Sequence, residues 1–218
     1  MKLMLIRHGE PDYASDSLTP RGHEEARLLA KALADVRIDA IYASPMGRAQ
    51  LTATYTADLK RMPITTLDWL RELDGNYGPA LWAWNLSGSE VFRGETPFTI
   101  ENWHELAPYG AHMQPVAAEF WGHFDRFMAS QGYVREGQGY RTTQERDERS
   151  LAFFFHAGAT LTLLSHLLHV PLPVVYAQFA CDPSSRTTLR FEAEGAFGVF
   201  RLECLNDTSH VSPPSPPG

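Results

Sequence analysis

Residues 2–10 read KLMLIRHGE, an apolar run that ends in an arginine, a histidine and a glycine. A short apolar run that is followed by a glycine and a proline predicts a buried strand over residues 2–6 and a loop after it. Two side chains that can carry positive charge are costly at the end of a buried strand unless an anion meets them there. The stretch therefore predicts an anion site at Arg7 and His8, with phosphate as the first candidate.

Strands and helices are predicted to alternate along the chain. One helix is predicted from Pro20, with Thr19 as its N-cap, and a second helix after Ser44 and Pro45. Apolar runs predict further strands at residues 40–43, within residues 63–73 and at residues 150–155, the last followed by a helix. This alternation predicts an α/β fold, a three-layer α/β/α sandwich with a mostly parallel central sheet.

Two histidines directly follow predicted strands. His8 follows the first strand, and His156 follows the run SLAFFF. Open α/β sheets bind their ligands outside the carboxyl ends of the strands. We therefore expect both histidines at the ligand-binding edge of the sheet.

The composition changes within residues 75–149, where Gly, Pro and Trp are frequent. One helix is predicted from Pro115 to Ser130, and residues 137–149 are polar. We expect residues 75–149 to form a cap inserted into a single domain of residues 1–218. The cap holds aromatic residues that belong either to the core or to the wall of a pocket: Trp82, Trp84, Phe92, Phe98, Trp103 and Trp121.

The C-terminal part predicts a hairpin and a tail. Residues 186–205 alternate around Glu194 and Gly195, which predicts a hairpin at the edge of the sheet. The Pro-rich residues 211–218 predict a disordered tail.

Charge and composition exclude several classes of protein. The chain has 19 basic and 26 acidic residues and a net charge of −7, which argues against a nucleic-acid partner. It shows no secretory signal and no apolar stretch of membrane-spanning length, so we expect a cytoplasmic protein without a membrane partner. Cys181 and Cys204 lack CxxC spacing and are predicted to be reduced structural thiols. His166 and His169 lack a carboxylate at ligand spacing, so no metal site is expected.

Four fragments, taken in order, carry a family resemblance. They are LIRHGE at residues 5–10, SPMGRAQLTA at 44–53, LRELDG at 70–75 and FFFHAGA at 153–159. Together they resemble the histidine phosphatase superfamily, in its phosphoglycerate-mutase-like branch (branch 1). The segments LTPRGHEEA and LNDTSHV also look like family segments, and the histidine of the second, His210, is assigned a structural role.

The resemblance implies a role for each matched residue. His8 would be the nucleophile that takes the phosphoryl group, and Glu72 would be the acid and base for the leaving alcohol and the water. Three further residues would surround the phosphate oxygens: Arg7, Arg48 and His156. Bidentate guanidinium groups suit phosphoryl transfer because they position the phosphate and neutralise its charge. No metal or cofactor is implied.

Physical reasoning adds expectations about these groups. A nucleophilic histidine must be neutral, and neighbouring arginines lower its pKa. An acid that works near pH 7 needs a raised pKa, which partial burial beside Trp69 and Leu73 would give to Glu72. We also expect the backbone amides of Gly9 and Gly158, and the N-terminus of the helix after His156, to face the anion.

Three functions remain open. The expected function is hydrolysis of a small-molecule phosphate monoester through a phosphohistidine, by a protein that could form a homodimer. The first alternative is a phosphoglycerate mutase, but Pro11 and Ala14 replace a serine and an asparagine of the mutase pattern, and residues 75–149 contain no lysine. The second is a non-catalytic protein that binds a phosphate ligand, favoured by the same departures and by Ala157, where the family usually has glycine.

Overall fold

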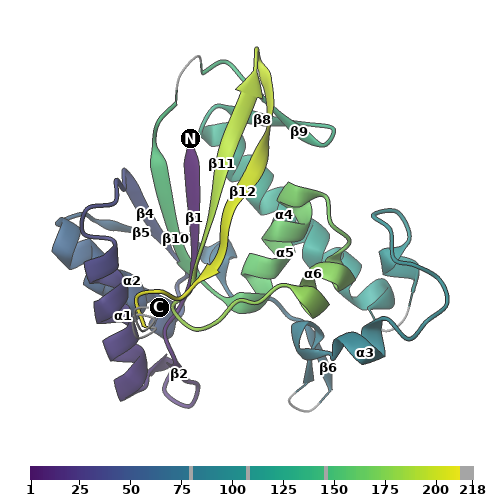
Figure 1. Cartoon of the computed structure of the whole chain (residues 1–218), viewed down its shortest axis with the longest axis horizontal. Helices are drawn as coiled ribbons and strands as arrows, with labels where there is room; N and C mark the ends of the chain where they lie inside the picture. The colour runs from purple at the N-terminus through teal and green to yellow at the C-terminus, as the bar shows by residue number, and fades with distance from the viewer. Residues whose placement is uncertain (79–80, 107–108, 145–146, 212–218) are drawn as a thin grey trace, which may run out of the picture.

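The computed structural model has an eight-stranded central sheet with helices on both faces (Figure 1). It describes residues 1–78, 81–106, 109–144 and 147–211. In spatial order the strands are β5 (Ile64–Thr66), β4 (Ala40–Ala43), β10 (Ser150–Phe155), β1 (Lys2–Arg7), β11 (Arg186–Glu194), β12 (Phe197–Asp207), β9 (Gly139–Thr142) and β8 (Tyr133–Glu136).

The sheet is mixed rather than mostly parallel. Strands β5, β4, β10 and β1 pair in parallel, whereas β11, β12, β9 and β8 continue the sheet in antiparallel pairs. The predicted hairpin β11–β12 therefore exists but is not at the edge, because β9 pairs with β12. The expected α/β/α sandwich is confirmed, with a larger antiparallel part than the sequence predicted.

Two groups of helices cover the two faces. Helices α1 (Pro20–Ala32) and α2 (Gly47–Lys60) lie on one side, and α4 (Gly110–Ser130), α5 (Ala157–Leu168) and α6 (Leu172–Gln178) lie on the other (Figure 1). Thr19 caps α1 as predicted, since its side chain accepts a hydrogen bond from the backbone N–H of Gly22. Of the helices in the described chain, none is long and apolar enough to cross a membrane.

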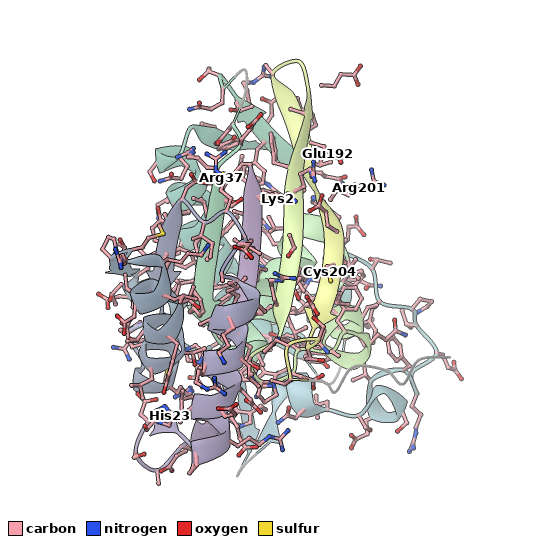
Figure 2. The ribbon with its side chains drawn as sticks, turned by 60° about the vertical axis from the view of Figure 1, so that its left-hand side comes forward. Lys2, His23, Arg37, Glu192, Arg201 and Cys204 are labelled. Atoms are coloured by element: carbon pink, nitrogen blue, oxygen red, sulfur yellow. The ribbon has the colours of Figure 1, made fainter. Side chains whose placement is uncertain are left out.

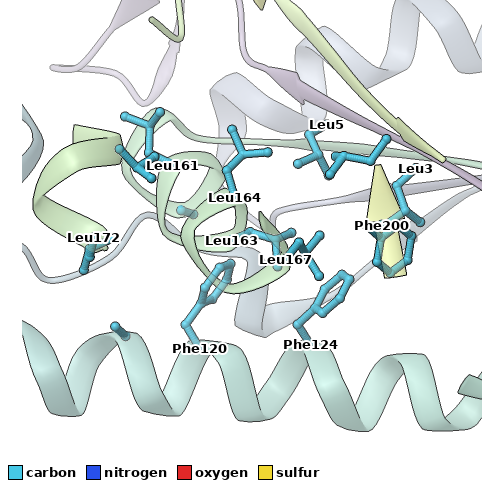
Figure 3. Packing of buried hydrophobic residues seen from close by; sticks show 14 of the residues in the cluster. Leu3, Leu5, Phe120, Phe124, Leu161, Leu163, Leu164, Leu167, Leu172 and Phe200 are labelled. Atoms are coloured by element: carbon cyan, nitrogen blue, oxygen red, sulfur yellow. The ribbon is translucent and has the colours of Figure 1, made fainter. Parts of the chain in front are cut away.

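Strand β1 is buried on both faces and joins two hydrophobic clusters. Leu3 and Leu5 belong to the larger cluster, where they meet side chains of α4, α5 and β12 (Figure 3). Met4 and Ile6 belong to the smaller cluster under α1 and α2. This two-sided burial is typical of the parallel strands at the centre of an α/β sheet.

The expected cap is only in part separate from the core. Helix α4 starts five residues before the predicted Pro115, because the buried face that includes Met113 and Phe120 continues through the proline. Strands β8 and β9 also come from the expected cap range, and they extend the central sheet. Their buried Tyr133 and Tyr140 face the core. The predicted cap of residues 75–149 stays a prediction, and its strands β8 and β9 are part of the central sheet.

The remaining cap segment carries short elements: β6 (Asn76–Gly78), β7 (Leu81–Trp82), a 3-10 turn at Ala83–Asn85 and helix α3 (Gly88–Val91). Hairpin β6–β7 lies at the same end of the sheet as the small hairpin of β2 (Pro11–Asp12) and β3 (Ser17–Leu18) (Figure 1). The carboxyl ends of β1 and β10 point to this end. The single-domain organisation stays a prediction, and residues 212–218 of the predicted tail lie outside the described residues.

The long hairpin β11–β12 carries charged side chains on the face that it shares with α1 and α2. Figure 2 shows Lys2, Glu192 and Arg201 on this face. Lys2 pairs with Glu203 at 3.0 Å, and Arg201 pairs with Glu192 at 3.5 Å. These ion pairs make the face polar where no helix covers it.

Candidate active site

The ends of β1 and β10 bring His8 and His156 together. The two strands are parallel neighbours in which Arg7 is in register with Phe155, and the backbone N–H of His8 donates to the Phe155 carbonyl at 3.0 Å. The centres of the two imidazole rings are 5.2 Å apart. The two histidines therefore meet at one edge of the sheet, where the sequence placed them.

His8 has one protonated and one free ring nitrogen. Its Nδ1 lies 2.7 Å from the Gly9 carbonyl oxygen, which can only accept, so Nδ1 carries the proton. Its Nε2 accepts a hydrogen bond from Nε of Arg48 at 3.2 Å. The side chain is buried, and burial, with Arg7 and Arg48 nearby, lowers the pKa of His8 to about 3. His8 is thus a neutral imidazole whose lone pair is on Nε2.

Arg48 lies in the first turn of α2 and is held by a residue that sequence reasoning missed. Its Nη1 donates to Oδ1 of Asp16 at 2.5 Å, and the other carboxylate oxygen accepts from the backbone N–H of Gly47 at 2.7 Å. Although burial raises the pKa of Asp16, these hydrogen bonds outweigh it and lower the pKa. The guanidinium also lies 5.4 Å from the centre of the Tyr13 ring. Asp16 therefore fixes the direction of Arg48.

Arg7 is anchored by the backbone of a distant segment. Its Nη1 donates to the carbonyl oxygen of Cys181 at 2.6 Å, while its buried Nε has no hydrogen-bond partner among the described residues. Burial raises the pKa of the Cys181 thiol to about 11, and the nearby positive charge of Arg7 offsets part of this rise. Cys181 and Cys204 are both free thiols.

His156 lies behind the cavity wall. It is fully buried, its Nε2 is 2.9 Å from Oγ of Ser44, and its Nδ1 has no hydrogen-bond partner within the described chain. Burial and the positive groups around it lower its pKa well below the usual range. In the described chain the cavity wall reaches Ala157 but not the imidazole of His156.

Glu72 lies at the N-terminus of α5. Its carboxylate accepts hydrogen bonds from the backbone N–H groups of Leu73 at 3.1 Å, Gly158 at 3.1 Å and Ala159 at 2.9 Å. Burial raises the pKa of Glu72, although these three hydrogen bonds and Arg7 oppose the rise. Trp69, which was expected to help bury Glu72, packs against the aromatic side chains of α4 and lines a hollow together with Glu72 and Leu73.

Two expected anion donors have protein partners. The Gly9 amide donates to Oγ1 of Thr52 at 3.0 Å, and the Gly158 amide donates to Glu72. The expectation that these amides face the anion is therefore wrong for this structure. Thr52 is buried on α2 and gave no sequence signal beyond its place in the family-like segment.

The four charged or titratable groups face one cavity of about 580 Å³. We call Arg7, His8, Arg48 and Glu72 the floor of this cavity. The other lining residues form the rim: Tyr13, Met46, Leu73, Trp82, Trp84, Asn85 and Ala157. The rim is uncharged.

The other residues singled out in the sequence have structural partners. Trp103 is buried, and Phe92 contacts Phe98 at 6.2 Å between ring centres. His166 stacks on Trp121 and binds Asp125 at 3.0 Å. His210 binds Oγ of Ser184 at 2.8 Å, and no three His, Cys, Asp or Glu side chains of the described residues form a metal-binding group.

Comparisons with known proteins agree with the fold. Residues 3–82 match the model of the histidine phosphatase superfamily (branch 1). Phosphoserine phosphatase 1 of Hydrogenobacter thermophilus is 34% identical over 201 residues, which are 88% of this chain and 87% of that protein.

Solved structures have the same fold at low sequence identity. Phosphoserine phosphatase of Entamoeba histolytica, in complex with phosphoserine, has a TM-score of 0.67 at 19% identity, over 97% of this chain and 99% of that one. A mycobacterial glucosyl-3-phosphoglycerate phosphatase with inorganic phosphate has a TM-score of 0.67 at 22% identity, over 97% and 99% of the two chains. The chain belongs to the histidine phosphatase superfamily (branch 1).

Proposed function

We propose that the protein is a phosphomonoesterase that hydrolyses a small-molecule phosphate ester through a phosphohistidine on Nε2 of His8. One observation carries the proposal: the unprotonated Nε2 of a neutral histidine lies beside Arg48 on a cavity that also holds Arg7 and a carboxyl group. A lone pair, positive charge for the phosphate and an acid for the leaving group are the parts that phosphoryl transfer to a side chain needs.

The first half of the reaction forms the phosphohistidine. Arg7 and Arg48 bind the phosphate oxygens, and Arg48 moves its Nε from His8 to an oxygen of the substrate. Nε2 then attacks phosphorus, and the bond from phosphorus to the alcohol oxygen breaks. Protonated Glu72 gives its proton to that oxygen, for which its raised pKa is suited.

The second half releases phosphate. The Glu72 carboxylate takes a proton from a water molecule, and the water oxygen attacks phosphorus as the bond to Nε2 breaks. Inorganic phosphate leaves, His8 is neutral again, and Glu72 is again protonated. The steps use no metal or cofactor.

Hydrolysis is favoured over mutase chemistry by the rim. A mutase for phosphoglycerate needs positive charge for a second anionic group of its substrate. The described rim holds neither lysine nor arginine. Because a relative is named phosphoserine phosphatase, phosphoserine is included among the compounds to test. The cytoplasmic location and the homodimer stay predictions.

The test uses radiolabelled p-nitrophenyl phosphate. A brief reaction is quenched, and acid-labile, alkali-stable label is expected on His8. His8→Ala should remove the label and lower kcat by about a thousandfold or more, because the nucleophile is lost. His112→Ala, which changes an exposed histidine of α4, is the control and should keep both the label on His8 and the kcat of the unchanged protein. Full activity in His8→Ala would overturn the proposal, and binding without turnover would favour a phosphate-binding protein.

A further inference from the structure

The place of the leaving group follows from Glu72, so this inference rests on the proposed function. The acid must reach the oxygen that leaves, and its own carboxylate is fixed by the amides of Gly158 and Ala159. The indole of Trp84 packs on Gly158 so closely that a Cβ atom there would lie 2.5 Å from the ring. The group attached to the leaving oxygen therefore lies beside Trp84.

Trp84 is fixed from several sides. A Cβ atom on Gly75 would also meet this ring, at 2.3 Å. Tyr176 of α6 contacts the ring edge-on, with 6.0 Å between centres. Trp82 stacks on Trp84 at 5.5 Å and 12°, and 37% of Trp82 is exposed. The two indoles form a rigid aromatic wall that leads from Glu72 to solvent.

The wall has no charge to match a charged alcohol. Residues 76–87, NYGPALWAWNLS, contain no acidic or basic residue. Tyr13 and Asn85 supply neutral polar groups to the rim. Arg71 is exposed and lines a neighbouring hollow together with Asp68, Asp74 and Glu119. Glu72 and Leu73 line both hollows, whereas Arg71 does not line the cavity.

This difference in charge decides the class of substrate. Phosphoserine brings a carboxylate and an ammonium group into the cavity, and a charged group that loses water without a charged partner is strongly penalised. A flat apolar group instead gains by burying its surface against the indoles. We propose that the natural substrate is the phosphate ester of a neutral alcohol with an aromatic or other flat apolar group, rather than of an amino acid or sugar acid.

The experiment compares three esters of primary alcohols, which leave with similar difficulty: 2-phenylethyl phosphate, ethyl phosphate and O-phosphoserine. We expect kcat/KM for 2-phenylethyl phosphate to exceed that for phosphoserine by about tenfold or more. Trp82→Ala should lower the ratio of kcat/KM for 2-phenylethyl phosphate over ethyl phosphate by about fivefold. Phe92→Ala removes an exposed aromatic ring from the same segment, outside the rim, and should keep the ratio.

Binding is measured separately from turnover. His8→Ala, which cannot form the phosphohistidine, is titrated with each ester by calorimetry, and 2-phenylethyl phosphate should bind most tightly. Tighter binding or faster turnover of phosphoserine would overturn this inference and leave the proposed function intact. An unchanged ratio in Trp82→Ala would also overturn it. Absence of turnover in the unchanged protein would overturn the proposed function, while the binding order would still decide the class of ligand.

Discussion

The floor and the rim of the cavity are held in place by different forces. In the floor, each charged or titratable side chain has a hydrogen bond to backbone or to a carboxylate: Arg7 to Cys181, His8 to Gly9, Arg48 to Asp16 and Glu72 to the start of α5. In the rim, Trp82 and Trp84 are held by stacking and by contact with glycines. The described rim contains no charged group.

This difference separates the reaction from the choice of substrate. The floor can hold a phosphate and supply a nucleophile and an acid, whatever alcohol is attached. The rim contacts the alcohol and leaves the phosphate to the floor. Changes in the floor should therefore lower rates for every ester, whereas changes in the rim should alter the ratio between esters.

The largest effect is expected from Glu72→Gln. For ethyl phosphate we expect kcat/KM, which reports only the steps through release of the alcohol, to fall by about a thousandfold, because the alkoxide would have to leave without a proton. For p-nitrophenyl phosphate the fall in kcat/KM should be much smaller, since its leaving group is stable as an anion; the loss of Glu72 as the base for water lowers kcat for both esters. Steady-state kinetics on both esters measure the difference, and Glu119→Gln, which changes an exposed carboxyl group on α4, is the control. An equal loss of kcat/KM for both esters would contradict the role of Glu72 as the acid.

The buried floor should also make stability depend on pH. The pKa of His8 is lowered to about 3, mainly by burial, whereas an unfolded chain has a histidine pKa of about 6.5. As the pH falls below 6.5, His8 becomes protonated in the unfolded chain but stays neutral in the folded chain. The contribution of His8 to the free energy of unfolding is therefore fully present above pH 6.5 and is lost as the pH falls. Between pH 7 and pH 5 this loss is about 2 kcal/mol.

Urea unfolding of His8→Asn tests this expectation. The variant replaces a titrating side chain by one that does not titrate. Between pH 7 and pH 5 its free energy of unfolding should therefore decrease less than that of the unchanged protein, and the two decreases should differ by about 2 kcal/mol. His112→Asn changes an exposed histidine and should follow the unchanged protein. Equal pH dependence in His8→Asn would show that the folded protein accepts the proton on His8.

The sequence predicts the centre of the fold better than its far edge. Strands β1 and β10 are apolar and almost completely buried, and the apolar β4 is buried at two of its four residues, so their composition alone identifies them. Strands β8 and β9 read YVRE and GYRT, and in each of them polar side chains face away from the core. Such short polar strands resemble loops until β12 is present to pair with them. The predicted edge hairpin was wrong in its position for this reason.

The residues of the floor were predictable because each lies in a local sequence motif. The residues that hydrogen-bond to the site residues and hold them in place were not predictable. Asp16 contacts Gly47 and Arg48 from 31 and 32 residues away, and nothing in its own neighbourhood marks it. Ser44 and Thr52 contact His156 and Gly9 across 112 and 43 residues of the chain. These contacts depend on how β1, α2 and β10 pack together. The lack of lysine in the expected cap was visible in the sequence, whereas the residues that form the rim and the stacking of Trp82 on Trp84 were not.

The smallest effect is expected from Asp16→Asn, and it distinguishes the floor from the rim within one hairpin. Asp16 and Tyr13 lie between β2 and β3, but Asp16 holds Arg48 and Tyr13 lines the rim. A guanidinium has five N–H groups, so Arg48 can keep its bond to Asp16 and still bind a phosphate. Loss of the charged partner should lower kcat/KM by about tenfold for both 2-phenylethyl phosphate and ethyl phosphate.

The constant ratio between the two esters is the decisive measurement for Asp16→Asn. If the whole hairpin collapsed, Tyr13 would move as well, and the ratio would change together with the rate. Calorimetry with inorganic phosphate gives the sign of the effect, because a positioning carboxylate strengthens phosphate binding whereas a competing carboxylate weakens it. Tighter phosphate binding in Asp16→Asn would mean that Asp16 occupies the place of the substrate. Asp58→Asn, on the exposed side of α2, is the matched control and should change neither kcat/KM nor the affinity for phosphate.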